Sequence, residues 1–410
     1  MKLMTGTVIA QIIPIAITPI LSRYFTPEDF GVYAVFTSIT AILIIFSTGR
    51  LEFAIMLPKK DLDANKIVVV IIGFGLLFAL LIYLILLIGG NVILSAVKLD
   101  ALRHVKFLLP LSVFFAAANI ALKYLKNRKQ SFSTIRNVTI LGSTTRGSLN
   151  VAFALLNPIH IGLIINQALS FIASFLLLIR KEIHEIYFVV QEITLKDSIA
   201  VVKRHIKLIY YLVPGGIINT FAVQLPVLFI AFFYNENEVG QFSMAQRLIS
   251  VPLVFIMTAF SDTFRQLAND LYRDNGSNRK FFLKNVLRLC IIGIIPFIML
   301  YIFAPQLFQT FLGSQWVEAG KIVRILTLMF YVKFVLSGLS GVVIQVAEKY
   351  QYEILYQVLF LILSSGGFII GHLIFNNLYY ALAFYSIAAI LMYFLSFLLA
   401  YKVSKEGTVI

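Results

Sequence analysis

The sequence predicts an all-α membrane protein with about twelve transmembrane helices, arranged as two bundles of six. Hydrophobic residues make up 60% of the 410 residues and charged residues only 13%. The mean hydropathy is +0.91. A water-soluble domain cannot bury that much apolar surface, so lipid must cover part of it. The chain also holds many runs of about 20 apolar residues, the length that crosses a bilayer as a helix.

Twelve runs are expected to span the membrane, and a strongly polar stretch at 180–207 separates the sixth from the seventh. This division predicts an N-terminal bundle at 1–179, a cytoplasmic linker at 180–207 and a C-terminal bundle at 208–410. The first run is not followed by a small-residue cleavage site, so we expect it to be retained. The predicted spans are 4–22, 31–55, 67–88, 107–125, 138–156, 159–179, 209–233, 240–263, 285–303, 322–344, 353–375 and 378–401.

The two halves share a pattern at an offset of 209 residues, the distance from Gly6 to Gly215. The acidic turn 27–29 is matched by 236–238, and Gly31 is matched by Gly240. An even division of spans makes the halves parallel repeats, and two such bundles are expected to enclose a central cavity.

Glycine and proline residues inside the first and seventh spans are candidate conformational hinges. In membrane helices these residues loosen the backbone while neighbouring helices satisfy the freed groups. Close helix packing is the alternative explanation for the glycines. The candidate hinge residues are Pro19, Pro214, Gly215 and Pro226.

The Lys and Arg residues between the spans predict the orientation in the membrane. They concentrate in the segments 56–66, 126–137, 180–207 and 265–284. Basic loops stay in the cytoplasm, so both termini are expected there and 235–239 is expected outside. Topology therefore explains the net charge of +15 without a nucleic-acid partner.

Motifs of soluble enzymes are absent from the sequence. It contains no P-loop, HExxH, GxSxG or cysteine pair. One cysteine, Cys290, makes neither a disulfide nor a metal site. We expect no cofactor and no metal, and whether a proton or sodium ion drives turnover stays open.

Four cations inside the predicted spans are the candidate substrate-binding residues: Arg50, Arg146, Arg247 and Lys333. A charge at bilayer depth is costly unless it faces protein or water. Snorkelling to the interface is an equal alternative for Arg50. Glu52 lies two residues after Arg50 and, on an α-helix, is expected on a different side. Cations without partners predict a cavity that binds an anion, and guanidinium groups fit phosphate oxygens well.

Amide side chains in the same spans are possible lining of the cavity, where they would bond sugar hydroxyls. Hydrogen bonding between helices is the alternative role for each of them. They are Gln11, Asn150, Asn219, Gln224 and Gln246. The basic segment 126–136 is expected either to hold anionic headgroups at the inner leaflet or only to fix topology.

Several stretches resemble a known family. The opening TGTVIAQIIP (5–14), TPILSRYF (18–25), PEDFGVY (27–33) and RLEFAIMLP (50–58) are similar to the start of bacterial polysaccharide exporters. GQFSMAQRLISVP (240–252) fits the same pattern. These exporters are the Wzx-type O-antigen flippases of the multidrug/oligosaccharidyl-lipid/polysaccharide superfamily, which has a MATE-like fold.

The resemblance implies two six-helix bundles that move an undecaprenyl-pyrophosphate-linked sugar unit to the outer leaflet of the bacterial inner membrane. In this hypothesis the cations bind the pyrophosphate and the lipid tail stays in the bilayer, with other polysaccharide assembly proteins as possible partners. A drug/cation antiporter of the same fold is the alternative, although it would need an embedded carboxylate. A membrane polysaccharide polymerase is less favoured because the expected outer segments 89–106 and 304–321 are short.

Overall fold

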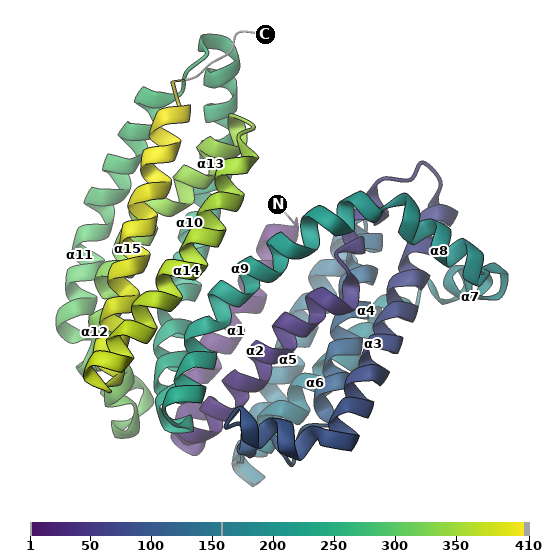
Figure 1. The fold of residues 1–410 in the computed structure, drawn as a ribbon, viewed down its shortest axis with the longest axis horizontal. Helices are drawn as coiled ribbons and strands as arrows, with labels where there is room; N and C mark the ends of the chain where they lie inside the picture. The colour runs from purple at the N-terminus through teal and green to yellow at the C-terminus, as the bar shows by residue number, and fades with distance from the viewer. Residues whose placement is uncertain (1, 157–158, 406–410) are drawn as a thin grey trace. The chain divides into compact units, whose positions relative to one another are not determined.

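The computed structural model describes residues 2–156 and 159–405. Every regular element in these ranges is a helix, as Figure 1 shows. The long helices are α1 (Lys2–Tyr24), α2 (Pro27–Thr48), α3 (Asp61–Ala96), α4 (Leu108–Arg128), α5 (Phe132–Leu156), α6 (His160–Ile179), α9 (Ile206–Phe233), α10 (Glu236–Asn275), α11 (Arg279–Leu312), α12 (Val317–Val332), α14 (Tyr350–Phe375) and α15 (Leu378–Val403). The short elements are η1 (Leu51–Met56), η2 (Asp100–Leu102), α7 (Ile183–Glu192), α8 (Leu195–Arg204), η3 (Ser314–Trp316), η4 (Lys333–Ser337) and α13 (Gly338–Val346).

Ten described segments are long and apolar enough to cross a membrane. They coincide with ten of the twelve predicted spans, and α1 and α5 lie at the two other predicted positions. The sequence of α5 includes Arg136 and Arg146, which make it less apolar. It packs along α1, where Gly147 leaves room for the side chain of Ile17. The predicted all-α, multi-pass membrane fold is confirmed.

Several helices extend beyond the predicted edges. The 36 residues of α3 correspond to about 54 Å at 1.5 Å per residue, whereas a hydrocarbon core is about 30 Å thick. The segments 89–106 and 304–321 are largely helical, as continuations of α3 and α11 and the start of α12. Helices α3 and α11 therefore do not end at the limits of their apolar runs, and the expectation that 89–106 and 304–321 face the outside stays a prediction.

The chain packs as two compact units. Unit 1 comprises Met1–Thr220 and Val227–Gly240, and unit 2 comprises Phe221–Pro226 and Gln241–Ile410. Most of α9 thus packs with unit 1. The sequence-based division into 1–179, 180–207 and 208–410 stays a prediction.

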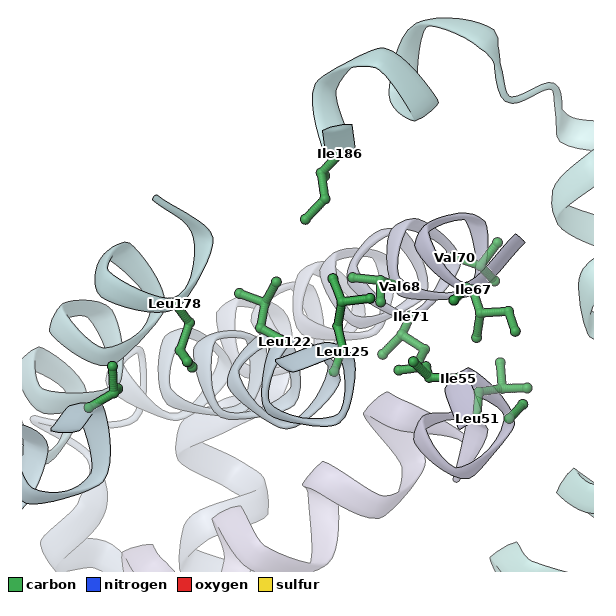
Figure 2. Packing of buried hydrophobic residues seen from close by; sticks show 14 residues of the cluster. Leu51, Ile55, Ile67, Val68, Val70, Ile71, Leu122, Leu125, Leu178 and Ile186 are labelled. Carbon is green, nitrogen blue, oxygen red and sulfur yellow. The ribbon is translucent and has the colours of Figure 1, made fainter. Parts of the chain in front are cut away.

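A cluster of buried apolar side chains connects η1, α3, α4, α6 and α7 within unit 1 (Figure 2). Leu122 and Leu125 of α4 point into this cluster and are fully buried. Residues three apart share one face of a helix. Of the two residues between them, Tyr124 is partly buried and packs against the same cluster, and Lys123 is half-buried.

The second predicted span, 31–55, is divided in the structure. α2 begins with a capping box in which the Thr26 hydroxyl accepts from the Asp29 backbone N–H at 3.3 Å. It ends at Thr48, because Gly49 adopts a left-handed conformation with φ 55° and its N–H donates to the Ile45 carbonyl. The 3₁₀ helix η1 follows. The prediction of one continuous helix was wrong here because Gly49 favours a helix C-cap.

The polar linker contains two short helices, α7 and α8. A second capping box starts α8, where the Thr194 hydroxyl accepts from the Asp197 N–H at 3.2 Å. Before α7, Glu182 lies buried and forms ion pairs with Lys126 and Lys129, both from the basic segment 126–136. Much of that segment's charge is therefore used inside the protein, which favours a structural role over binding of headgroups.

Residues related by the 209-residue repeat contact one another in unit 1. Gly31 lies against the backbone of Glu236, and Gly240 lies against the backbone of Pro27. These contacts are reciprocal at the repeat offset, because 27 corresponds to 236 and 31 to 240. A Cβ on either glycine would overlap a carbonyl oxygen, so both positions require glycine for the close approach of the first turns of α2 and α10.

The tenth predicted span, 322–344, is interrupted in unit 2. Between α12 and α13, residues Lys333–Ser337 form the π-helical turn η4. π-helical turns are rare in proteins overall, and those that occur often lie at functional sites. Lys333, one of the predicted cations, is the first residue of this turn.

Candidate anion-binding site

Arg146 of α5 is half-buried in unit 1 and held by two neighbours on α6. Its Nε donates a hydrogen bond to the Ser170 hydroxyl at 3.1 Å, and its guanidinium carbon lies 5.6 Å from the centre of the Phe171 ring. No carboxylate forms an ion pair with Arg146 among the described residues. The guanidinium is thus oriented by its neighbours but keeps its charge available.

Lys123 of α4 is a second cation at this position, and the sequence analysis did not single it out. It lies close enough to Arg146 for the two charges to repel. Within the described structure Lys123 has no carboxylate partner either. The available signal was its place inside the predicted span 107–125, near the end, where a lysine looks like a snorkelling residue.

Arg50 is paired, contrary to the expectation from sequence. Its Nη1 lies 3.6 Å from Oε1 of Glu52, and the Glu52 side chain is only 4% exposed. The expectation assumed that both residues belong to an α-helix. Instead Arg50 has a left-handed backbone with φ 56° and precedes a 3₁₀ helix, and this geometry brings the two side chains together.

Gly216 of α9 provides room for the Arg50 guanidinium, which lies where a Cβ on residue 216 would be. This glycine therefore serves close packing. The neighbouring Gly215 has open space around it, and its hinge role stays a prediction, as do those of Pro19, Pro214 and Pro226.

The C-terminal turns of α4 connect these cations. The ring of Tyr124 lies edge-on to Phe53 at 5.4 Å, and the Arg50 guanidinium lies 6.0 Å from the Phe53 ring. Phe53 thus lies beside both Tyr124 and Arg50, while Lys123, the residue before Tyr124, lies close to Arg146. We refer to Arg50, Lys123 and Arg146 as the α4 cation cluster.

This cluster carries three positive groups and one nearby carboxylate, with aromatic rings beside two of the cations. Guanidinium and ammonium groups donate charge-assisted hydrogen bonds to phosphate oxygens. Aromatic rings offer flat apolar faces next to these donors. The arrangement is suited to an anion with attached uncharged groups.

The remaining candidate residues are described within their own units. Arg247 is half-buried on α10, and Lys333 is exposed on η4; both belong to unit 2. Among the amides, Asn150 is buried and its Oδ1 accepts from Asn166 at 2.9 Å, which favours a role between helices. The amides Gln11, Gln224 and Gln246 are half-buried, and Asn219 is exposed. Their part in a cavity stays a prediction.

Two solved structures illustrate the likeness in fold. A multidrug resistance MATE family transporter of the MOP superfamily, in an inward-facing conformation, has a TM-score of 0.77 at 15% identity, over 97% of this chain and 96% of that chain. Lipid II flippase MurJ, in an inward closed conformation, has a TM-score of 0.76 at 13% identity, over 98% and 89%. At such low identities the likeness concerns the fold alone.

No curated protein sequence matches the chain. A family model does: the model described as polysaccharide biosynthesis protein matches residues 20–321, which is most of the chain. The protein therefore belongs to the polysaccharide biosynthesis protein family and has the multi-pass helical fold of MATE transporters.

Proposed function

We propose that this protein is a flippase for an undecaprenyl-pyrophosphate-linked oligosaccharide, such as an O-antigen or capsule repeat unit. It moves this substrate from the cytoplasmic to the periplasmic leaflet of the bacterial inner membrane by alternating access. The α4 cation cluster binds the pyrophosphate. Membership of the polysaccharide biosynthesis family and the fold shared with lipid II flippase MurJ support this proposal.

The observation that carries the proposal is the pair Lys123 and Arg146, two neighbouring cations without a carboxylate partner in the described structure. Two like charges at close range destabilise each other, and a bound anion relieves this repulsion. A pyrophosphate carries several negatively charged oxygens, so it can contact both cations at once. A cationic drug would instead meet three positive groups, which disfavours the antiporter alternative.

The test is display of surface polysaccharide in a null strain that carries variants of Arg146 and Lys123. We expect Arg146→Lys to retain more display than Arg146→Ala, because lysine keeps the charge but loses the planar fork. Arg146→Glu should be the weakest, because its carboxylate repels the anion. Membrane abundance of every variant is measured in parallel.

Arg136→Glu is the matched control, since Arg136 lies on the same helix and bonds only its neighbour Asn137 among the described side chains. Surface polysaccharide in the strain that carries Arg136→Glu should stay near the level seen with the parent protein. The proposal is wrong if Arg146→Glu and Lys123→Glu are abundant in the membrane and display polysaccharide as the control does.

A further inference from the structure

Two pockets in unit 2 adjoin each other and differ in chemistry. They share Leu253 of α10 and Phe334 of η4 as common walls. The larger has a volume of about 330 Å³ and is lined only by apolar side chains and one glycine. The smaller, about 150 Å³, contains Lys333 with Ser250 and Ser337.

The larger pocket has the size and access that a hydrocarbon chain needs. An apolar cavity of roughly 150 Å³ holds a benzene molecule, so this pocket has room for more than one isoprene unit. Two of its lining side chains, Ile256 and Ile292, are 51% and 60% exposed. The pocket therefore opens at the surface of unit 2, and a chain can enter from the side.

Prolines and a glycine shape this pocket. Pro252 of α10 and Pro296 of α11 both line it; each lacks a backbone N–H and crowds the preceding turn, so the helix surface is irregular there. Gly293 of α11 lies where a Cβ would be 3.1 Å from the Phe334 ring.

Lys333 gives the smaller pocket its charge. The residue is exposed and begins the π-helical turn η4. No described carboxylate pairs with it, and no carboxylate lines either pocket. An ammonium group with two hydroxyls beside an apolar pocket is complementary to a phosphate attached to a hydrocarbon chain.

We infer that unit 2 binds a polyprenyl pyrophosphate, with the first isoprene units in the larger pocket and a phosphate at Lys333. This inference rests on the proposed function and extends it, because part of the lipid chain then lies in the protein instead of remaining wholly in the bilayer. The site is a second contact for the lipid carrier and belongs to unit 2, whereas the α4 cation cluster belongs to unit 1.

The probe is a photoreactive analogue of farnesyl pyrophosphate, added to the full-length protein in lipid nanodiscs. We expect labelled peptides from α10 and α11, and competition by unlabelled farnesyl pyrophosphate but not by inorganic pyrophosphate. Ile292→Trp places a larger side chain in the larger pocket and should remove most of the labelling of α10 and α11. Lys333→Gln should lower labelling about tenfold at a probe concentration below saturation, because a charge-assisted contact with the pyrophosphate of the probe is lost.

Ile295→Trp is the matched control, since Ile295 is 68% exposed on the same helix and does not line the pocket. Equal thermal stability of the two tryptophan variants excludes misfolding as the cause. A second variant from α10, Ile256→Trp, should behave like Ile292→Trp.

The inference is overturned if Ile292→Trp and Lys333→Gln keep full labelling, or if phosphatidylglycerol competes as well as farnesyl pyrophosphate, which would assign the pocket to membrane phospholipid. Such a result leaves the proposed function intact when Arg146→Glu still abolishes display. Display at the level of the control by abundant Arg146→Glu and Lys123→Glu variants would refute the proposed function, whatever the labelling shows.

Discussion

The buried ion cluster around Glu182 yields the largest stability effect that we expect from a single substitution. Lys126 is 2% exposed and Glu182 7% exposed at their side chains, and Glu182 also pairs with Lys129. Glu182→Gln keeps the shape of the side chain but leaves the Lys126 ammonium buried without a counter-charge. Breaking a buried pair in this way costs about 3–5 kcal/mol.

Glu185 supplies the control within the same cluster. It pairs with Lys129 at 2.7 Å, but its side chain is 51% exposed and that of Lys129 is 20% exposed. Solvent screens such a pair, so Glu185→Gln should cost at most about 1 kcal/mol. Unfolding of the purified protein in detergent, followed by near-ultraviolet circular dichroism, measures both variants. Equal losses for the two would refute the assignment of the buried charge.

The same cluster gives a pH dependence with a defined sign. The hydrogen bonds from Lys129 and then from Asn65 hold the pKa of Glu185 below its ordinary value of 4.5. The contribution of Glu185 to the free energy of unfolding is therefore complete above pH 4.5 and is lost as the pH falls through the lowered pKa.

Burial disfavours the charge of Lys129, but hydrogen bonds to Glu182 and Glu185 outweigh burial and raise its pKa above 10.5. That contribution is complete below pH 10.5 and is lost as the pH rises through the raised pKa. Between pH 4.5 and pH 10.5, the contribution of Glu185 and Lys129 to the free energy of unfolding should therefore stay constant.

Three further predictions concern two close glycine contacts and the orientation in the membrane. Gly240→Val should destabilise it by about 1–3 kcal/mol through overlap with the Pro27 carbonyl, whereas Gly73→Ala, which meets no neighbour, should be neutral or stabilising by up to about 1 kcal/mol; similar unfolding curves would contradict this. Gly216→Val should displace the Arg50 guanidinium and lower display no further when combined with Arg50→Ala, and an additive loss would argue against that contact. In a Cys290→Ser background an impermeant thiol reagent added outside cells should label cysteine at 235 but not at 195, and labelling at 195 would reverse the predicted orientation.

The helices could be predicted because lipid imposes a simple rule. A segment inside the hydrocarbon must satisfy its own backbone groups, so apolar runs of sufficient length become helices whatever they pack against. The positions of α14 and α15, for example, differ from the predicted spans 353–375 and 378–401 by only a few residues. Helix ends were less predictable. They depend on local caps such as Gly49 and on polar extensions such as the last turns of α10, which the hydropathy of a span does not report.

The candidate site was predictable only in part, because contacts between helices decide the role of each charge. Arg146 was identified as a cation deep in a span, whereas its neighbour Lys123 was not, since nothing local to α4 places it beside α5. Arg50 was identified but assigned no partner, because the rule for α-helical neighbours does not hold across the break at Gly49.

Lys123 and Lys126 show why composition alone cannot separate a binding cation from a structural one. They lie three residues apart on α4, within one turn, and have the same side chain. Glu182, just before α7, reaches Lys126 and neutralises it in the interior. Lys123 faces Arg146 instead, so its charge adds to that of a second cation. Glu182, placed 56 positions after Lys126 in the chain, thus gives one lysine a structural role, whereas the other has no carboxylate partner in the described structure and is the one that we propose to bind an anion.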